Sequence, residues 1–354
     1  MPKETMSRRE RWQAVLRRQK PDRVPMDFQG TREALEGFMK ADGVSDERAL
    51  WERYHIDKRI MLTPRYVGPV LPDDEDFYGC RFREVNYGSG VYRERVFGPL
   101  EGFETLDELR VGYRWPDLMD VLEFSGLQAE ADRWAGYPIC IFGSEPFLYY
   151  KYLRGEEQAF MDLALNPDIV EYCLGRLYDT CHNVTRKILE SVRPGTVDMV
   201  IVAEDMGSQT GLLYSPEQIR RSFVPHFKRM TDLAHRHGAY VFHHSDGAIR
   251  QIIPELIEVG FDILNPVQHR CAGMDRVGLK RDFGDRLVFH GAVDNQEILP
   301  FGTPDQVRQE VVENIRILGE GGGFILGPCH NIQPNTAVAN IVALYEAGYA
   351  EGGS

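Results

Sequence analysis

The sequence contains no uninterrupted apolar run of about 18 residues, the length that a membrane-spanning helix needs. This absence excludes a membrane span, and no apolar N-terminal segment supports secretion. Glu10 follows Ser7 by three residues, a capping-box pattern that predicts a surface helix running to Arg18 and not a targeting peptide. We therefore expect a cytoplasmic protein.

The sequence also lacks an excess of positive charge. It has 41 Lys and Arg against 54 Asp and Glu, a net charge of -13, which argues against a nucleic-acid partner. The cysteines have no regular spacing, which fits a reducing compartment and not a disulfide framework. They are Cys80, Cys140, Cys173, Cys181, Cys271 and Cys329. Residues 208–211 and 319–323 lack the glycine spacing and the lysine of a phosphate-binding loop.

Short apolar runs alternate with helix-length amphipathic stretches along most of the chain. Such alternation predicts parallel strands joined by helices, and a count of eight predicts a closed barrel. The expected fold is an α/β (β/α)8 TIM barrel forming one domain over residues 1–354. The candidate strands are residues 24–28, 58–63, 137–142, 197–203, 239–243, 261–266, 287–291 and 323–327.

One segment breaks this rhythm. Residues 64–136 separate the second and third candidate strands and are far too many for a simple loop. Tyr87 to Gly90, followed by alternating Val91, Arg93 and Val96, predicts a hairpin within the segment. Because the segment leaves from the C-terminal end of a strand, we expect it to overhang the active site as a lid or substrate-binding region.

Three residues with metal-binding side chains follow the fifth and eighth candidate strands. His244 and Asp246 are two apart, so in extended chain their side chains point the same way, and Cys329 lies after the last strand. Catalytic residues of such barrels gather at the C-terminal ends of the strands, and these are ordinary zinc ligands. A single histidine at a strand end often only packs and hydrogen bonds, so the prediction rests on the combination.

Other polar residues end strands as well. Glu204 is a candidate fourth ligand or orienting acceptor for His244, and Asp205 is expected to be functional. Asp27 and Gln268 also end strands, whereas Asp294 is interpreted as a helix cap. His243 and His330 are weaker candidates, because neighbouring residues tend to face away. Aromatic residues near these ends would either wall a pocket for a flat ligand or fill the core. They are Phe28, Tyr66, Phe142, Phe147, Tyr149 and Tyr150.

Several segments resemble one known group of proteins over nearly the whole chain. They are Glu10 to Trp12 with Pro21 to Pro25, Pro146 to Gly155, Ala203 to Gly207, Tyr214 to Glu217, His244 to Gly247, and Gly327 to Asn335. The group is the uroporphyrinogen decarboxylase superfamily, and within it the corrinoid-dependent methyltransferase branch that includes methylcobamide:coenzyme M methyltransferases. The resemblance implies the same eight-fold barrel.

The resemblance also implies a zinc site. The methyltransferase branch carries His-x-Cys-Gly after strand 5 and a second cysteine after strand 8, and the matching positions here are His244, Asp246 and Cys329. The first cysteine is thus replaced by aspartate. A harder ligand leaves zinc more Lewis acidic, which favours an ether or alcohol oxygen over the thiol of coenzyme M.

Our hypothesis is a zinc-dependent methyltransferase that moves a methyl group between a small methylated compound, such as an aryl methyl ether, and the cobalt of a corrinoid protein. Asp205 or Glu204 would orient His244 or handle a proton, while Asp27, Phe28, Phe147, Tyr149 and Gln268 would contact the substrate. The segment 64–136 would help to form the docking mouth for the corrinoid partner.

Two alternatives remain open. One is a metal-free decarboxylase that uses Asp205 or Asp27, although the arginine-rich segment that true uroporphyrinogen decarboxylases carry after strand 1 is replaced by residues 28–32, where only Arg32 is cationic. The other is a non-catalytic barrel that binds a corrinoid or an aromatic ligand.

Overall fold

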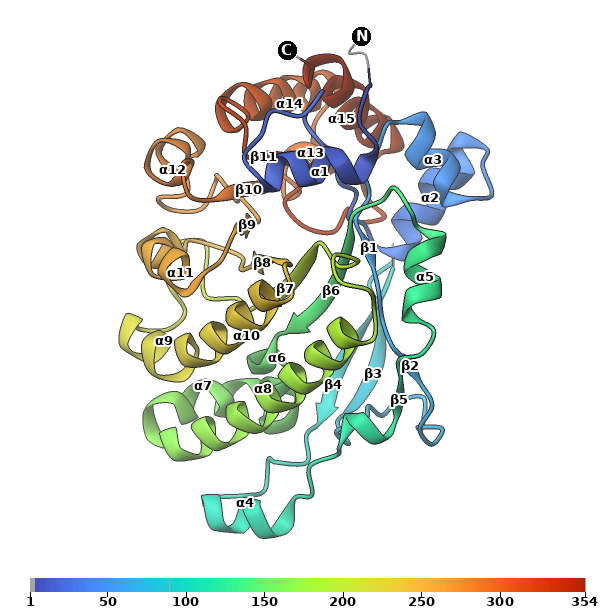
Figure 1. The fold of residues 1–354 in the computed structure, drawn as a ribbon. Coiled ribbons are helices and arrows are strands. Elements are labelled where there is room, and N and C mark those ends of the chain that lie inside the picture. Colours follow the sequence, from blue (N-terminus) through green and yellow to red (C-terminus); the bar gives the residue numbers. More distant parts are fainter. Residues whose placement is uncertain (1–3, 89, 354) are drawn as a thin grey trace.

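A curled sheet of seven parallel strands dominates the computed structural model, which describes residues 4–88 and 90–353 (Figure 1). The spatial order of the strands follows the chain. They are β1 (Ile60–Met61), β6 (Ile139–Ser144), β7 (Met199–Ala203), β8 (Tyr240–His244), β9 (Ile263–Asn265), β10 (Val288–Val293) and β11 (Phe324–Pro328). The predicted α/β class with parallel strands is confirmed, and the half-barrel is of the TIM-barrel type.

Helices connect the strands, as parallel pairing requires. Helices α9 and α14 begin with capping boxes, in which Ser215 and Thr303 each accept a hydrogen bond from the backbone three residues on. The helices after β6 are α6 (Pro146–Arg154), α7 (Glu156–Leu165), α8 (Pro167–Glu190), α9 (Pro216–Ser222), α10 (Val224–Arg236), α11 (Ile253–Val259), α12 (Arg276–Phe283), α13 (Ile298–Phe301), α14 (Pro304–Leu318) and α15 (Val338–Glu351).

The first candidate strand, residues 24–28, is only a single parallel bridge between Met26 and Leu326 of β11. On the β11 side the pairing is regular, since Leu326 donates to the carbonyl of Pro25 and accepts from the backbone of Asp27. On the other side the Asp57 N–H donates to the carbonyl of Met26 at 2.6 Å, but the Met26 N–H donates to the Asp57 carboxylate at 2.9 Å, so a side chain replaces one of the two hydrogen bonds that a strand partner would make. The prediction of a full strand was therefore wrong.

Helix α1 (Arg8–Leu16) closes the concave face of the sheet at its N-terminal end. The predicted capping box is present, but the helix ends at Leu16 and is not a surface helix, because Trp12, Val15 and Leu16 are buried. They pack in one cluster with alternate residues of the strands: Cys140, Met199, Ile201, Phe242, Ile263, Val288 and Ile325. These alternate residues define the concave face. Helix α1 covers this face at the N-terminal ends of the strands, and we call the other end, at the C-terminal ends of the strands, the mouth.

The chain between β1 and β6 holds its own small elements. They are β2 (Arg65–Tyr66), β3 (Arg81–Asn86), β4 (Val91–Phe97), α4 (Leu106–Gly112), the 3-10 turn Leu118–Asp120, β5 (Leu122–Glu123) and α5 (Leu127–Arg133). Strands β3 and β4 form an antiparallel pair at the place where a hairpin is predicted, although Ser89 in its turn lies outside the described residues. In Figure 1 this pair lies beyond β1 and β6, away from the two termini. Its role as a lid stays a prediction.

Before β1 the chain forms α2 (Arg32–Asp42) and α3 (Glu47–Arg53).

Within the part of the chain that the structure describes, no helix combines the length and the apolar content that a membrane crossing requires. All six cysteines are free.

A buried ionic network joins α1 to the start of the sheet. The Asp57 carboxylate accepts hydrogen bonds from Arg11 at 2.6 Å, from Arg23 at 2.7 Å and from the backbone of Met26. The Asp57 side chain is fully buried and the two arginine side chains are at most 2% exposed. The Trp12 indole donates to the Asp57 carbonyl at 2.8 Å. One residue therefore fixes α1, the segment before β1 and the first bridge together.

We predict that Asp57→Ala lowers the free energy of unfolding by about 3–5 kcal/mol, because it leaves two buried guanidinium groups without their shared anion. Urea denaturation followed by circular dichroism measures this loss. Glu190→Ala is the control, since it breaks an exposed pair with Arg186 and should cost only about 0.3–0.5 kcal/mol. Equal effects of the two substitutions would contradict the assigned role of Asp57.

Candidate functional site

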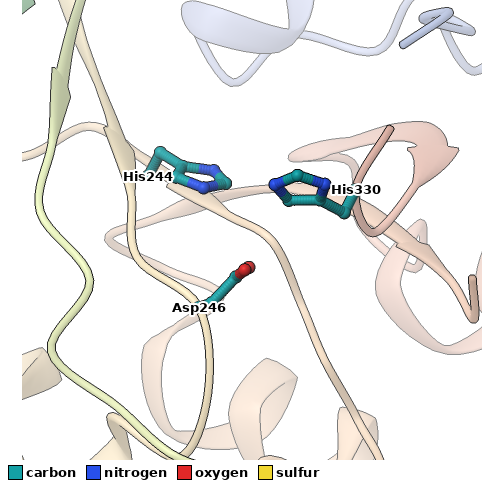
Figure 2. A group of neighbouring side chains, drawn as sticks. All are labelled: His244, Asp246 and His330. Carbon is teal, nitrogen blue, oxygen red and sulfur yellow. The ribbon is translucent and has the colours of Figure 1, made fainter. Parts of the chain in front are cut away.

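Two imidazoles and a carboxylate meet at the mouth. His244 ends β8, Asp246 follows two residues later, and His330 lies just after β11; one potential ligand atom from each lies within 4.8 Å of those of the other two. Figure 2 shows the two rings facing each other across a gap toward which the Asp246 carboxylate points. The ring centroids are 5.7 Å apart. The predicted partnership of His244 and Asp246 is thus present in the geometry.

The loop that carries Asp246 is held by a close backbone crossing. Gly247 has φ +89°, and a Cβ on it would lie 2.4 Å from the carbonyl carbon of Gly207. Hydrogen bonds tie the two loops on either side of the crossing: Gly207 donates to the carbonyl of Asp246, and Ala248 donates to that of Ser208. Gln268 accepts the Gly247 N–H at 2.5 Å. Gln268 therefore positions the loop that carries a candidate ligand.

One oxygen of Asp246 is buried without a hydrogen-bond partner. Burial raises the pKa of this carboxyl, with the Asp205 carboxylate acting in the same direction and His244 against it. A buried carboxylate oxygen that lacks a donor carries a large desolvation cost, which a cation would offset. Because two imidazole nitrogens approach the same point, the donor set fits a divalent metal such as zinc.

Asp205 borders this group from the loop after β7. Its Oδ1 accepts the Asp246 N–H at 3.0 Å and lies 3.9 Å from Nε2 of His244. The side chain is 46% exposed, so it faces the open mouth. The structure thus brings Asp205 next to both predicted ligands.

Glu204 lies elsewhere. Its side chain accepts hydrogen bonds from the Phe147 backbone at 3.1 Å and from the Tyr178 hydroxyl at 3.3 Å. Burial raises its pKa well above the ordinary value, with the Glu145 carboxylate adding to the effect. Its backbone N–H donates to the carbonyl of His244 at 2.9 Å. The carboxyl therefore holds the start of α6 and does not reach the imidazole of His244.

Cys329 is adjacent to the group but outside it. Its thiol is directed at the carbonyl of Val267 at 3.3 Å, and burial raises its pKa well above the usual value, with Glu310 and Asp294 contributing. His330 takes the place expected for Cys329. The alternation of side chains that made His330 a weaker candidate does not apply, because β11 ends at Pro328.

The predicted aromatic contacts divide between core and mouth. Phe28 and Phe147 are buried and pack in the hydrophobic core, so for them the core-filling interpretation holds. Tyr149 is half-buried, packs edge-on against Tyr78, and its pKa is raised by burial with help from the nearby Glu145 carboxylate. Sequence reasoning therefore placed Phe28 and Phe147 incorrectly at a pocket wall, whereas a substrate contact by Tyr149 stays a prediction.

Phe142 and Met61 form an apolar wall at the mouth. Each is 41% exposed although it belongs to a strand of the main sheet. Met61 pairs in register with Cys140, and Cys140 and Phe142 are two apart, so all three share the concave face. Met61 carries no signal in the sequence, because an apolar residue in a strand usually indicates core.

Glu145 was also missed. It follows β6, and burial raises its pKa to about 7, with His244 opposing and Asp205 adding to that shift. A carboxyl with such a pKa near a candidate metal site is suited to proton transfer at neutral pH. Its position directly after a strand, before Pro146, is the signal that could have identified it.

Asp27 is fully buried beneath the mouth and does not face solvent. Its carboxylate pairs with Arg59 and lies 3.1 Å from Nε2 of His290. His290 in turn contacts Asn265, which contacts His244. Asp27 is therefore linked to the ligand group through other side chains. Asp294 accepts the backbone N–H groups of residues 296–298 in the turn that leads into α13, although the N-cap residue of this helix is Glu297.

Comparisons with known proteins agree with this architecture. Residues 84–350 match the protein family described as uroporphyrinogen decarboxylase (URO-D). A methyltransferase from Methanosarcina mazei shares the fold with a TM-score of 0.70 and 18% identity, over 98% of this chain and 99% of that chain.

Uroporphyrinogen decarboxylases from Coxiella burnetii strains Dugway 5J108-111 and RSA 493 / Nine Mile phase I are each 31% identical over 85 residues. These alignments cover 22% of this chain and 23% of each relative. The matched segment is thus less than a quarter of the length of these curated relatives.

We predict that Gly247→Ala displaces Asp246 and lowers both metal affinity and stability, because the new methyl group meets the backbone of Gly207. Gly238→Ala is the matched control: Gly238 has φ +75° but nothing within 4 Å of a built Cβ. In the control, the free energy of unfolding should fall only by the cost of placing alanine in the left-handed backbone region, of order 1–2 kcal/mol. Urea denaturation and Co²⁺ titration measure the two effects, and equal losses would contradict the crossing as the constraint.

Proposed function

Since the chain belongs to the uroporphyrinogen decarboxylase family, we propose that it is a zinc-dependent methyltransferase that moves a methyl group between a small methylated compound and a corrinoid protein. The observation that carries the proposal is the unpartnered, buried oxygen of Asp246 beside two imidazoles. The fold shared with the Methanosarcina mazei methyltransferase is in keeping with it. In this proposal the chain around Met26, which forms a bridge with Leu326, closes the sheet of seven strands into a barrel.

The proposed ligands are His244, Asp246 and His330. Three protein ligands leave a further position open for substrate, as in catalytic zinc sites. A zinc ion held there would supply a Lewis acid to the heteroatom from which the methyl group departs. Cys329 would join the ligands only if its thiol left the Val267 carbonyl.

The substrate class follows from the two walls of the mouth. His244, Asp246 and His330 offer nitrogen and oxygen and no thiolate, which favours an oxygen substrate over a thiol. Phe142 and Met61 offer exposed apolar surface that suits an aromatic ring. An aryl methyl ether combines the two properties.

Proton handling is assigned to the carboxyls at the mouth. Glu145, with its pKa near 7, would supply a proton to the oxygen that loses its methyl group. Asp205 would orient the loop of Asp246 through the hydrogen bond to its backbone. Glu204 would support this arrangement from outside by holding the start of α6.

The corrinoid protein would approach the mouth from the side of residues 64–136. Several large apolar side chains of this segment are exposed, which is typical of surfaces that meet a partner. They are Tyr66, Val67, Val70, Tyr87, Val91, Tyr92, Val96 and Phe97. We propose that this reaction takes place in the cytoplasm.

A decarboxylase is the second candidate, because the family description and the Coxiella burnetii relatives carry that name. A substrate with many carboxylates needs several cations at the site. The two cationic side chains that directly precede β1 already have partners. Arg59 contacts Asp27 and Gln29, and Lys58 donates to the carbonyl of Phe28. The methyltransferase is therefore the better supported function.

We predict about one zinc ion per chain, lost in the double variant His244→Ala with Asp246→Ala and strongly reduced in His330→Ala. Elemental analysis of purified protein measures this content. Cys329→Ser should retain the metal, and His237→Ala, a change outside the ligand group, serves as the control. If His330→Ala kept its full zinc content and Cys329→Ser lost the zinc, the third ligand would be Cys329 and not His330.

We further predict that the zinc-loaded protein methylates a cob(I)alamin-carrying protein with methoxylated aromatics as donors, followed by the change in cobalt absorbance. His244→Ala should abolish this activity, and Phe142→Ala should raise the KM for the aromatic donor. Turnover of a carboxylated pyrrole with release of CO₂ and without metal would support the decarboxylase. Ligand binding without any turnover would support a purely binding barrel.

A further inference from the structure

A line of buried polar side chains runs from His244 into the concave face. Nδ1 of His244 lies 2.6 Å from Oδ1 of Asn265, and Nδ2 of Asn265 lies 2.8 Å from Nδ1 of His290. Nε2 of His290 then lies 3.1 Å from the Asp27 carboxylate, which pairs with Arg59. The structure thus connects a candidate metal ligand to a buried ion pair through an amide and a second imidazole.

We infer that Asn265 and His290 are positioning residues that hold His244 in its Nδ1–H tautomer, with the lone pair of Nε2 facing Asp246 and His330. This inference rests on the proposed function for its purpose, because a ligating histidine must present an unprotonated nitrogen to the metal. The tautomer itself can be observed without metal and without turnover.

The direction of each hydrogen bond follows from the amide of Asn265. Its oxygen can only accept and its NH₂ can only donate, so Nδ1 of His244 must carry the hydrogen and Nδ1 of His290 must accept one. A neutral ring at position 290 then carries its hydrogen on Nε2. That hydrogen points to the Asp27 carboxylate, which fixes the ring of His290 from the other side.

Burial makes this order stable. His290 and Asp27 are fully buried and Asn265 is 1% exposed, so water cannot substitute for a lost partner. Burial lowers the pKa of His290 well below its ordinary value, with Arg59 and Lys58 acting in the same direction, so the ring stays neutral. Arg59 also lies 3.2 Å from Nε2 of His290, and the Asp27 oxygen accepts from both groups.

The strand register explains why these residues meet. His244 pairs with Asn265, and Leu264 pairs with Phe289, the neighbour of His290. The side chains of Asn265 and His290 therefore lie next to His244 on the concave face and continue from it below the mouth. Gly291 follows His290 with φ +97°, a left-handed backbone conformation that favours glycine, and a Cβ there would lie 3.2 Å from the carbonyl oxygen of Pro328.

The test measures the tautomer of His244 by long-range ¹H–¹⁵N NMR in metal-free, ¹⁵N-histidine-labelled protein, with His244→Gln to assign its signals. We expect the Nδ1–H form in the wild type and a mixture of forms in Asn265→Leu, which offers no acceptor. Asn265→Asp keeps the acceptor and should retain the Nδ1–H form. An Nε2–H form in the wild type, or an unchanged tautomer in Asn265→Leu, would overturn the inference.

A second measurement titrates the same variants with Co²⁺ against a chromogenic chelator. Asn265→Leu should weaken binding by roughly 10–100-fold, the usual effect of removing a group that orients a ligating histidine, and Asn265→Asp by much less. Asn340→Leu is the matched control, because Asn340 is a buried asparagine whose side-chain amide donates to the carbonyls of Leu299 and Gly302. Equal weakening in Asn265→Leu and Asn340→Leu would reduce the role of Asn265 to general stability and overturn the inference.

The two measurements separate the inference from the proposed function. A wild-type protein that shows the Nδ1–H tautomer but binds neither Co²⁺ nor Zn²⁺ would refute the metal-dependent methyltransferase and leave the positioning of His244 intact. A wild-type protein that binds the metal with the opposite tautomer would refute the positioning and leave the metal site intact.

Discussion

The buried carboxylate of Asp57 is the contact on which the rest of the architecture depends. It neutralises two arginines from different segments and takes the backbone N–H of Met26 that a regular strand would have used. Arg11 also pairs with Asp22 and Arg23 with Glu4, but loss of the Asp57 carboxylate would remove the anion that they share and leave the buried Met26 N–H without its acceptor. These contacts set the position of residues 26 and 27 between β11 and the segment that precedes β1.

The position of residues 26 and 27 also determines which side chains lie beneath the mouth. Because Met26 faces away from the concave side, Asp27 faces into it, where it meets Arg59 and His290. The polar line through Asn265 then reaches His244. The electrostatic organisation of the mouth thus begins at the ionic network beside α1, at the other end of the sheet.

At the mouth, polar and apolar walls have different origins. The polar wall is built by the end of β8 and by the loops after β7, β8 and β11, of which the first two are tied by the crossing of Gly207 and Gly247. The apolar wall is built by side chains of β1 and β6 that the curvature leaves exposed. The strands therefore supply His244 and the exposed apolar surface, whereas loops carry Asp246 and His330, a division that suits many chemistries on one scaffold.

The carboxylate at position 246 can be understood from this environment. A thiolate needs few hydrogen bonds, whereas a buried carboxylate needs compensation for both oxygens. Asp246 has one oxygen without a partner, so the structure retains an electrostatic demand that a cation would meet. The chemistry proposed for the mouth follows from that demand.

The sequence by itself determined the parallel α/β fold and the pairing of His244 with Asp246, because strand periodicity and the position of polar residues at strand ends are local properties. It could not determine whether Cys329 or His330 joins them, since β11 stops at Pro328 and alternation ends there. It also could not show that Phe28 and Phe147 pack in the core, or that Asp27 is covered.

These outcomes were decided only by the tertiary structure. Which side of a residue is covered depends on segments distant in the chain, such as α1, α15 and the loop after β7. The register of β8, β9 and β10 brought His244, Asn265 and His290 into line, although 21 and 25 positions separate neighbouring members. Long-range register is set by the packing of the whole sheet, and no local pattern in the sequence encodes it.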